Sequence, residues 1–96
     1  MPDNDKDKAK KLSVKFPETL VGGAYSNSMS VTHTKDEFVL DFYMMAPPQG
    51  VAVARIITSP GHIKRVLNVL NGSITKYENK YGPIQVTEEP GGKTLN

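Results

Sequence analysis

The fold of this 96-residue chain is decided by residues 38–81, which read FVLDFYMMAPPQGVAVARIITSPGHIKRVLNVLNGSITKYENKY. Residues 38–45 form an apolar segment with the composition of a β-strand, and this strand is the most clearly indicated one in the chain. Residues 46–50 interrupt it, because their two prolines have no N–H to donate to a sheet. Residues 51–58 are rich in β-branched side chains and predict a second strand.

A long helix is predicted directly after these strands. Serine is a favoured N-cap residue and proline is favoured at the first helical position, so Ser59 and Pro60 mark its start. Gly82 followed by proline marks its end. The apolar side chains between them are spaced by four and three residues in turn, which places them in one stripe along the helix. The stripe consists of Ile63, Leu67, Leu70, Ile74, Tyr77 and Tyr81.

Two more strands are predicted upstream. Residues 25–33 alternate between larger and small polar side chains, and residues 34–37 form a turn that leads into the strand at 38–45. Residues 12–16 also alternate and predict a short strand that ends at Pro17. The expected fold class is therefore α+β, an antiparallel sheet of three to four strands with one long C-terminal helix packed on one face.

The alternation along residues 38–45 defines two faces of the sheet. The first face carries Phe38, Leu40, Phe42 and Met44, and the second face carries Val39, Asp41, Tyr43 and Met45. A register that places Met44 opposite Ala52 and Leu40 opposite Ile56 gathers apolar residues of both hairpins on the first face, and this agreement supports the register. We expect the helix stripe to cover the first face.

The second face is the candidate interaction surface. The same register places Asp41 opposite Arg55, and the residues around this pair are too apolar for a solvated sheet surface. The surface predicts a protein–protein interface, with self-association preferred. The alternatives are that the chain's own N-terminal strand covers it, or that it binds extended or unfolded polypeptide. The predicted interface residues are Val39, Asp41, Tyr43, Met45, Val51, Val53, Arg55 and Ile57.

Composition excludes several classes of site. The chain has no cysteine, so disulfides and zinc sites built on thiolates are excluded, and two histidines are too few for a histidine-rich metal site. No metal and no cofactor are expected. No apolar run approaches the length of a membrane span, and no apolar signal region follows the N-terminus, so we expect a cytoplasmic protein.

The charge is concentrated at the N-terminus. Residues 1–16 contain five lysines and three aspartates, whereas residues 17–82 are close to neutral. We expect three regions: a disordered charged tail at 1–11, a single α+β domain at 12–82, and a flexible C-terminal tail at 83–96. A lysine-rich tail also leaves weak nucleic-acid binding open, although no basic stripe on the domain extends it.

The serine and histidine residues that could act in catalysis are better explained by structural roles. Ser59 lacks the Gly-x-Ser-x-Gly context of a hydrolase nucleophile and is expected to be a helix cap. His33 is expected to pack against Phe38, and His62 lies in the first turn of the helix. No second acid or nucleophile clusters with Asp41. No catalytic residue is assigned, and we expect that the protein is not an enzyme.

A set of short motifs occurs in an order that resembles a known family. The motifs are Tyr25-Ser26-Asn27, Glu37-Phe38 with Asp41-Phe42, Ala54-Arg55, Ser59-Pro60-x-His62, and Tyr77-Glu78 with Tyr81-Gly82. Over about residues 22–82 the chain resembles a bacterial and archaeal family known as domain of unknown function 3467. Gly61 departs from the expected pattern, because a better helix former would be expected there. The resemblance implies no catalytic residues, and it suggests that Asn27, Asp41, Arg55, Pro60 and His62 are shared positions.

The expected architecture also resembles that of the export chaperone SecB, in which antiparallel strands precede a long helix. Fold alone does not establish function. The preferred function is a small non-catalytic protein-interaction module that forms a homo-oligomer, a dimer or a tetramer. The alternatives are a chaperone-like binder of extended polypeptide and a weak nucleic-acid binder that uses the N-terminal tail.

Overall fold

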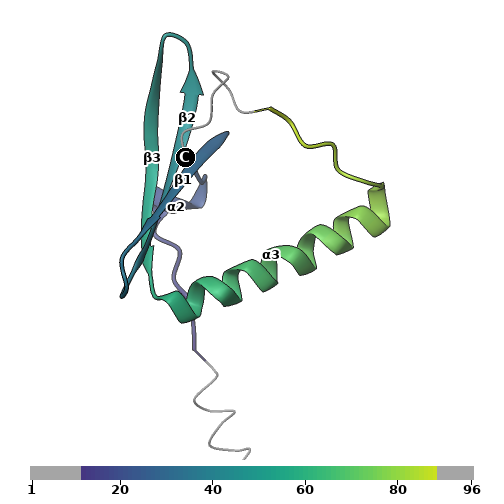
Figure 1. Cartoon of the computed structure of the whole chain (residues 1–96), viewed down its shortest axis with the longest axis horizontal. Helices are drawn as coiled ribbons and strands as arrows, with labels where there is room; N and C mark the ends of the chain where they lie inside the picture. Colours follow the sequence, from purple (N-terminus) through teal and green to yellow (C-terminus); the bar gives the residue numbers. More distant parts are fainter. Residues whose placement is uncertain (1–11, 89–96) are drawn as a thin grey trace, which may run out of the picture.

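A computed structural model describes residues 12–88 of the chain (Figure 1). Three strands form one antiparallel sheet in the order β1-β2-β3, and a long helix follows the last strand. This arrangement confirms the predicted α+β class. The elements are α2 (Glu18–Val21), β1 (Ser28–His33), β2 (Phe38–Ala46), β3 (Gln49–Thr58) and α3 (Pro60–Tyr81).

The first hairpin turns at the predicted residues 34–37, and it brings His33 against Phe38 as expected. His33 lies opposite Phe38, and Met29 lies opposite Phe42. Thr34 organises the turn, since its Oγ1 accepts hydrogen bonds from the backbone N–H groups of Asp36 and Glu37, both at 3.2 Å. A threonine hydroxyl that bonds the backbone two and three residues on is a common way to stabilise a turn.

The second hairpin differs from the prediction because its turn is shorter. Only Pro47 and Pro48, joined by a cis peptide bond, separate β2 from β3. A two-residue turn pairs Ala46 with Gln49 and, further along, Met44 with Val51, not with Ala52 as predicted. The predicted register holds in the other half of the hairpin, where Phe42 lies opposite Ala54.

A β-bulge reconciles the two halves of this hairpin. The register shifts between Phe42 and Tyr43: Phe42 pairs with Ala54, Tyr43 pairs with Ala52, and Val53 has no partner on β2. Without the extra residue, the tight turn would place every following β3 side chain on the wrong face. The bulge therefore restores the facing that places Asp41 opposite Arg55.

Residues 12–17 do not add a fourth strand. Within the described range, residues 12–17 belong to neither a helix nor a strand, and Leu12, Val14 and Phe16 are exposed. The prediction of a strand at 12–16 was wrong, because alternation alone does not form a strand and this segment pairs with neither β1 nor β3 at the edges of the sheet. β1 also begins three residues later than predicted, at Ser28. The predicted tails at 1–11 and 89–96 lie outside the described residues.

Both ends of α3 are stabilised by local contacts. Ser59 is the N-cap, and its Oγ accepts a hydrogen bond of 3.1 Å from the N–H of His62. At the other end, the N–H of Gly82 donates to the carbonyl of Glu78, and the N–H of Ile84 donates to the Glu78 carboxylate at 3.0 Å. Gly82 has φ of 98°, a conformation that glycine adopts without strain. The predicted helix ends are confirmed.

The position of α3 is the main departure from prediction. Figure 1 shows α3 leaving the end of β3 and extending away from the sheet, so its stripe does not cover the first face of its own chain. Among residues 12–88 no hydrophobic side chain is buried, and Ser28 is the only buried residue. The contacts between elements are concentrated in the two strand pairs. Within residues 12–88, a single copy thus forms its secondary structure without burying an apolar core.

Candidate functional site

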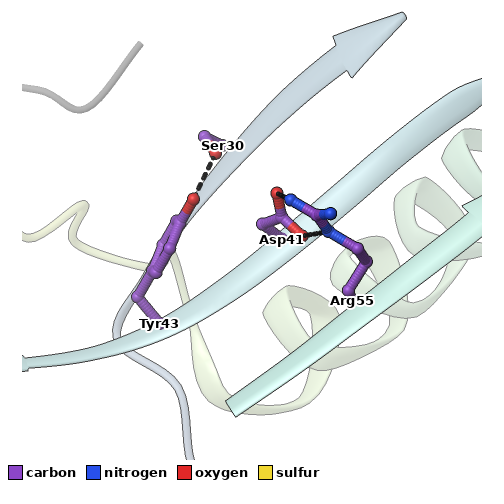
Figure 2. Close-up of polar contacts among 4 residues, drawn as sticks. All are labelled: Ser30, Asp41, Tyr43 and Arg55. Carbon is purple, nitrogen blue, oxygen red and sulfur yellow. Dashed lines mark hydrogen bonds and ion pairs between the residues drawn. The ribbon is translucent and has the colours of Figure 1, made fainter. Parts of the chain in front are cut away.

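The centre of the second face is a polar row that crosses all three strands. Ser30 of β1 lies opposite Asp41 of β2, which in turn lies opposite Arg55 of β3. Residues that are opposite each other in an antiparallel sheet project from the same face. Figure 2 shows these three side chains together with Tyr43, which comes from β2 beside them.

Asp41 and Arg55 form a bidentate ion pair. Arg55 Nε donates to Asp41 Oδ1 at 2.6 Å, and Arg55 Nη2 donates to Asp41 Oδ2 at 2.9 Å. The Asp41 side chain is 13% exposed, whereas that of Arg55 is 68% exposed. The pairing that the sequence predicted is confirmed, in the parallel geometry that guanidinium and carboxylate groups favour.

The ion pair fixes the charge state of both groups. The hydrogen bonds from Arg55 hold the pKa of Asp41 below its ordinary value, and the positive charge of Arg55 acts in the same direction against partial desolvation. The Asp41 carboxylate in turn raises the pKa of Arg55. Asp41 is therefore a weak proton acceptor with both oxygens already engaged, so the arrangement suits orientation of the pair better than proton transfer.

Tyr43 ties the first two strands together beside this pair. Its hydroxyl lies 2.8 Å from Ser30 Oγ, as Figure 2 shows. A tyrosine fixed by its hydroxyl keeps its ring in one orientation and presents a rigid aromatic surface. Such rings are enriched at protein–protein interfaces.

The bulge changes the membership of the predicted interface. Val51 pairs with Met44 and so lies on the first face, not on the second. Val53 has no partner on β2, and it lines a cleft together with Phe42 and Ala54 of the first face. The second face of β2 and β3 therefore keeps six of the eight predicted residues: Val39, Asp41, Tyr43, Met45, Arg55 and Ile57.

Sequence reasoning missed the structural role of Asn27. Its side-chain amide accepts a 2.8 Å hydrogen bond from the N–H of Met45 and donates a 3.0 Å bond to the carbonyl of the same residue. The amide thereby takes the place of one residue of a neighbouring strand. Ser26 Oγ lies 2.9 Å from the Tyr43 carbonyl, and the Asn27 N–H donates to that same carbonyl at 3.0 Å. These contacts explain why β1 needs no regular pairing before Ser28.

The remaining candidates have the structural roles expected of them. The rings of His33 and Phe38 stack with their centroids 5.2 Å apart. His62 Nδ1 lies 3.0 Å from Arg65 Nη2 on the surface of α3, one helical turn along the chain. In the described part of the chain, no group of three His, Cys, Asp or Glu residues could hold a metal ion.

A cleft of about 400 Å³ lies between α2 and the sheet. Its walls are mainly apolar, with Leu20 on the α2 side and Phe42 and Ala54 on the first face. α2 therefore lies over the part of the first face around these residues. No helix within residues 12–88 has the length and apolar character of a membrane span.

A family model described as "Protein of unknown function (DUF3467)" matches residues 1–86. The chain belongs to this family. The search of curated proteins and the search of solved structures returned no match. The likeness to SecB is not shown by these comparisons, and together with the cytoplasmic location it stays a prediction.

Several of the positions that the sequence associated with DUF3467 have defined structural roles in this member. Asn27 fixes the start of β1 against Met45, Asp41 and Arg55 pair across the second face, and Pro60 begins α3. Nucleic-acid binding through the charged tail also stays a prediction, because residues 1–11 lie outside the described range.

Proposed function

We propose that this DUF3467 protein is a non-catalytic interaction module whose folded form is a homo-oligomer. The supporting observation is the lack of a buried hydrophobic side chain among residues 12–88, although the helix and all three strands are formed. Burial of apolar surface is the dominant favourable term in folding. A chain that leaves such surface exposed as a single copy gains most of its stability by assembling.

The second face is the proposed contact surface between copies. Ile57 is 56% exposed, and it lies opposite Val39 at one end of the face. Met45 lies toward the other end, with Tyr43 and the ion pair between them. Tyrosine, methionine and arginine are enriched at interfaces. In a symmetric dimer the same patch would meet itself, so each ion pair would lie near its symmetry equivalent and help to fix the register of the two sheets.

The non-catalytic part of the proposal rests on the chemistry of Asp41. Both of its carboxylate oxygens accept hydrogen bonds from Arg55, and its pKa is lowered. A general base works best when its pKa lies near the working pH and its oxygens are free to accept a proton. We therefore assign Asp41 to assembly and register.

Solution mass tests self-association directly. Light scattering across a concentration range should give a concentration-independent dimer or tetramer. Ile57→Lys should lower the mass, because it places a charge on the surface that assembly would desolvate. Val69→Lys is the matched control, since Val69 is an exposed β-branched residue of α3 outside the apolar stripe. A monomer at every concentration would refute self-association, and an unchanged mass for Ile57→Lys would refute the use of the second face.

A chaperone-like module is the second candidate, and the cleft between α2 and the sheet favours it. Binding of extended polypeptide needs an apolar groove that stays open after assembly. The cleft, lined by Leu20, Phe42 and Ala54 among others, has this character in the single chain. A hydrophobic dye should bind the intact oligomer under this alternative, and Leu20→Lys should reduce the signal. An oligomer that does not bind the dye would exclude the chaperone-like alternative.

A further inference from the structure

The apolar stripe of α3 and the first face of the sheet are both left uncovered within one chain. The stripe residues Leu67, Leu70, Ile74, Tyr77 and Tyr81 are between 44% and 65% exposed. On the first face, Ile56 is 52% exposed and Val51 is 57% exposed. α2 lies over only the part of this face near Phe42. Each copy therefore has two complementary apolar surfaces, the stripe of α3 and the first face of the sheet, and the two do not contact each other within that copy.

The connection between β3 and α3 explains why they stay apart. β3 ends at Thr58 and α3 begins at Pro60, so Ser59 is the whole linker. Ser59 is extended, with φ of −83° and ψ of 157°, and the proline after it disfavours the helical conformation at this position. The cap from Ser59 to His62 and the backbone bond from the N–H of Ile63 to the Ser59 carbonyl fix the direction of the first turn. With this linker α3 extends away from its own sheet (Figure 1).

The dimensions of α3 match those of the sheet. Its 22 residues extend over about 33 Å, since the rise is about 1.5 Å per residue. The nine residues of β2 extend over about 30 Å at about 3.3 Å per residue. A stripe of this length can cover a whole strand pair. Short linkers that prevent an element from packing on its own chain are a common origin of exchange between copies.

We propose that α3 is exchanged between two copies, so that the stripe of each α3 lies on the first face of the second copy. The proposal rests on the self-association proposed above and identifies the surface that it uses in addition to the second face. The exchange would give each sheet the apolar layer that its own helix does not provide. It would also leave the second face free for sheet-to-sheet contact, so that a dimer could pair further into a tetramer.

The area involved is sufficient for a stable dimer. At roughly 200 Å² for a large apolar residue, five stripe residues that are about half exposed remove about 500 Å² from each helix. The facing sheet loses a similar area, and twofold symmetry doubles the total to about 2,000 Å². Stable interfaces of standard size bury about 1,600 Å². A second copy of this chain is therefore an adequate partner for the stripe.

Cross-linking between two single-cysteine variants tests the exchange, because the natural chain contains no cysteine. Leu70→Cys lies at the middle of the stripe, and Ile56→Cys lies on the first face. The two variants, one with an added tag to separate their masses, are unfolded together, refolded and treated with a short bismaleimide cross-linker. Exchange predicts a product that joins one chain of each kind. Val69→Cys replaces Leu70→Cys as the control and should lose this product, since Val69 lies outside the stripe.

The other outcomes overturn the proposal in distinguishable ways. A product that joins two Leu70→Cys chains, in place of the mixed product, would mean that the helices pack on each other. A link within one chain of the double variant, formed in the presence of excess natural chain, would mean that α3 folds back on its own sheet. If the light-scattering mass remains that of an oligomer in either case, the exchange fails and self-association stands. A monomeric mass would refute both the exchange of α3 and self-association.

Discussion

Replacement of Asn27 by alanine tests whether a single side chain fixes the edge of the sheet. The amide makes two hydrogen bonds to the backbone of Met45, at 2.8 and 3.0 Å. A typical hydrogen bond contributes about 1 kcal/mol net, so the loss of both should lower the free energy of unfolding by about 2 kcal/mol. For a domain of this size, that loss corresponds to a fall in Tm of about 8 to 15 °C.

The assay is thermal and urea unfolding followed by circular dichroism. All variants are compared at one protein concentration, because assembly makes stability depend on concentration. Asn71→Ala is the control, since Asn71 is an exposed residue of α3 and its replacement should change the free energy of unfolding by less than about 0.5 kcal/mol. If Asn27→Ala stayed within the range of this control, the amide would have no role in holding β1 to β2.

Asn27→Asp extends the same test through pH. The ionised carboxylate can still accept the N–H of Met45, but its second oxygen would face the Met45 carbonyl and repel it. The protonated acid has a hydroxyl donor and restores both bonds. Relative to the natural protein at the same pH, the variant should therefore be least stable at neutral pH and should recover in acid. A deficit that does not change with pH would contradict the assigned hydrogen bonds.

Three further changes test other contacts. The folded state lowers the pKa of Asp41, so the unfolded state binds a proton more readily at this carboxyl group. The ion pair should therefore stabilise the folded protein fully above about pH 4, and this stabilisation should be lost as the pH falls below that value. Asp41→Asn should remove this part of the pH dependence of urea unfolding. If the free energy of unfolding still fell in acid as it does in the natural protein, the ion pair would not be the cause of that fall. Ser59→Ala should cost about 1 kcal/mol in the same assay, whereas Ser59→Gly should cost only a few tenths, since glycine is tolerated at an N-cap; equal losses would argue against the cap. Gly72→Ala should raise the free energy of unfolding by about 1 kcal/mol, because an added methyl group meets no neighbour within 4 Å and alanine is the better helix former; a loss of stability would place a close partner against that side of α3.

Local patterns in the sequence were sufficient to predict most of the secondary structure. The apolar alternation of 38–45 and the β-branched run of 51–58 predicted two strands, and the Ser59-Pro60 and Gly82 signals predicted both ends of α3. Asp41 and Arg55 could be paired from the sequence because their register follows from the apolar residues beside them. In each of these cases the determining contacts are between near neighbours along the chain or across one hairpin.

The exceptions involve contacts that no local pattern specifies. The bulge at Val53 arises because the two-residue turn requires one strand register, whereas placing the apolar side chains on a common face requires a register that differs by one residue. The segment at 12–16 has the alternation of a strand but pairs with no strand of the sheet. The role of Asn27 depends on Met45, which lies 18 residues away, and a polar residue before a strand gives no signal of such a partner.

The sequence by itself therefore determined the strands of the sheet, the capped helix and the paired charges at the centre of the second face, since propensity, capping and cross-strand facing are local properties. Only the tertiary structure decided where α3 lies. The periodicity of its stripe shows that this side of the helix is suited to burial, but it does not specify the surface that buries it. The one-residue linker at Ser59 and the cap that follows it fix the direction of the helix away from its own sheet.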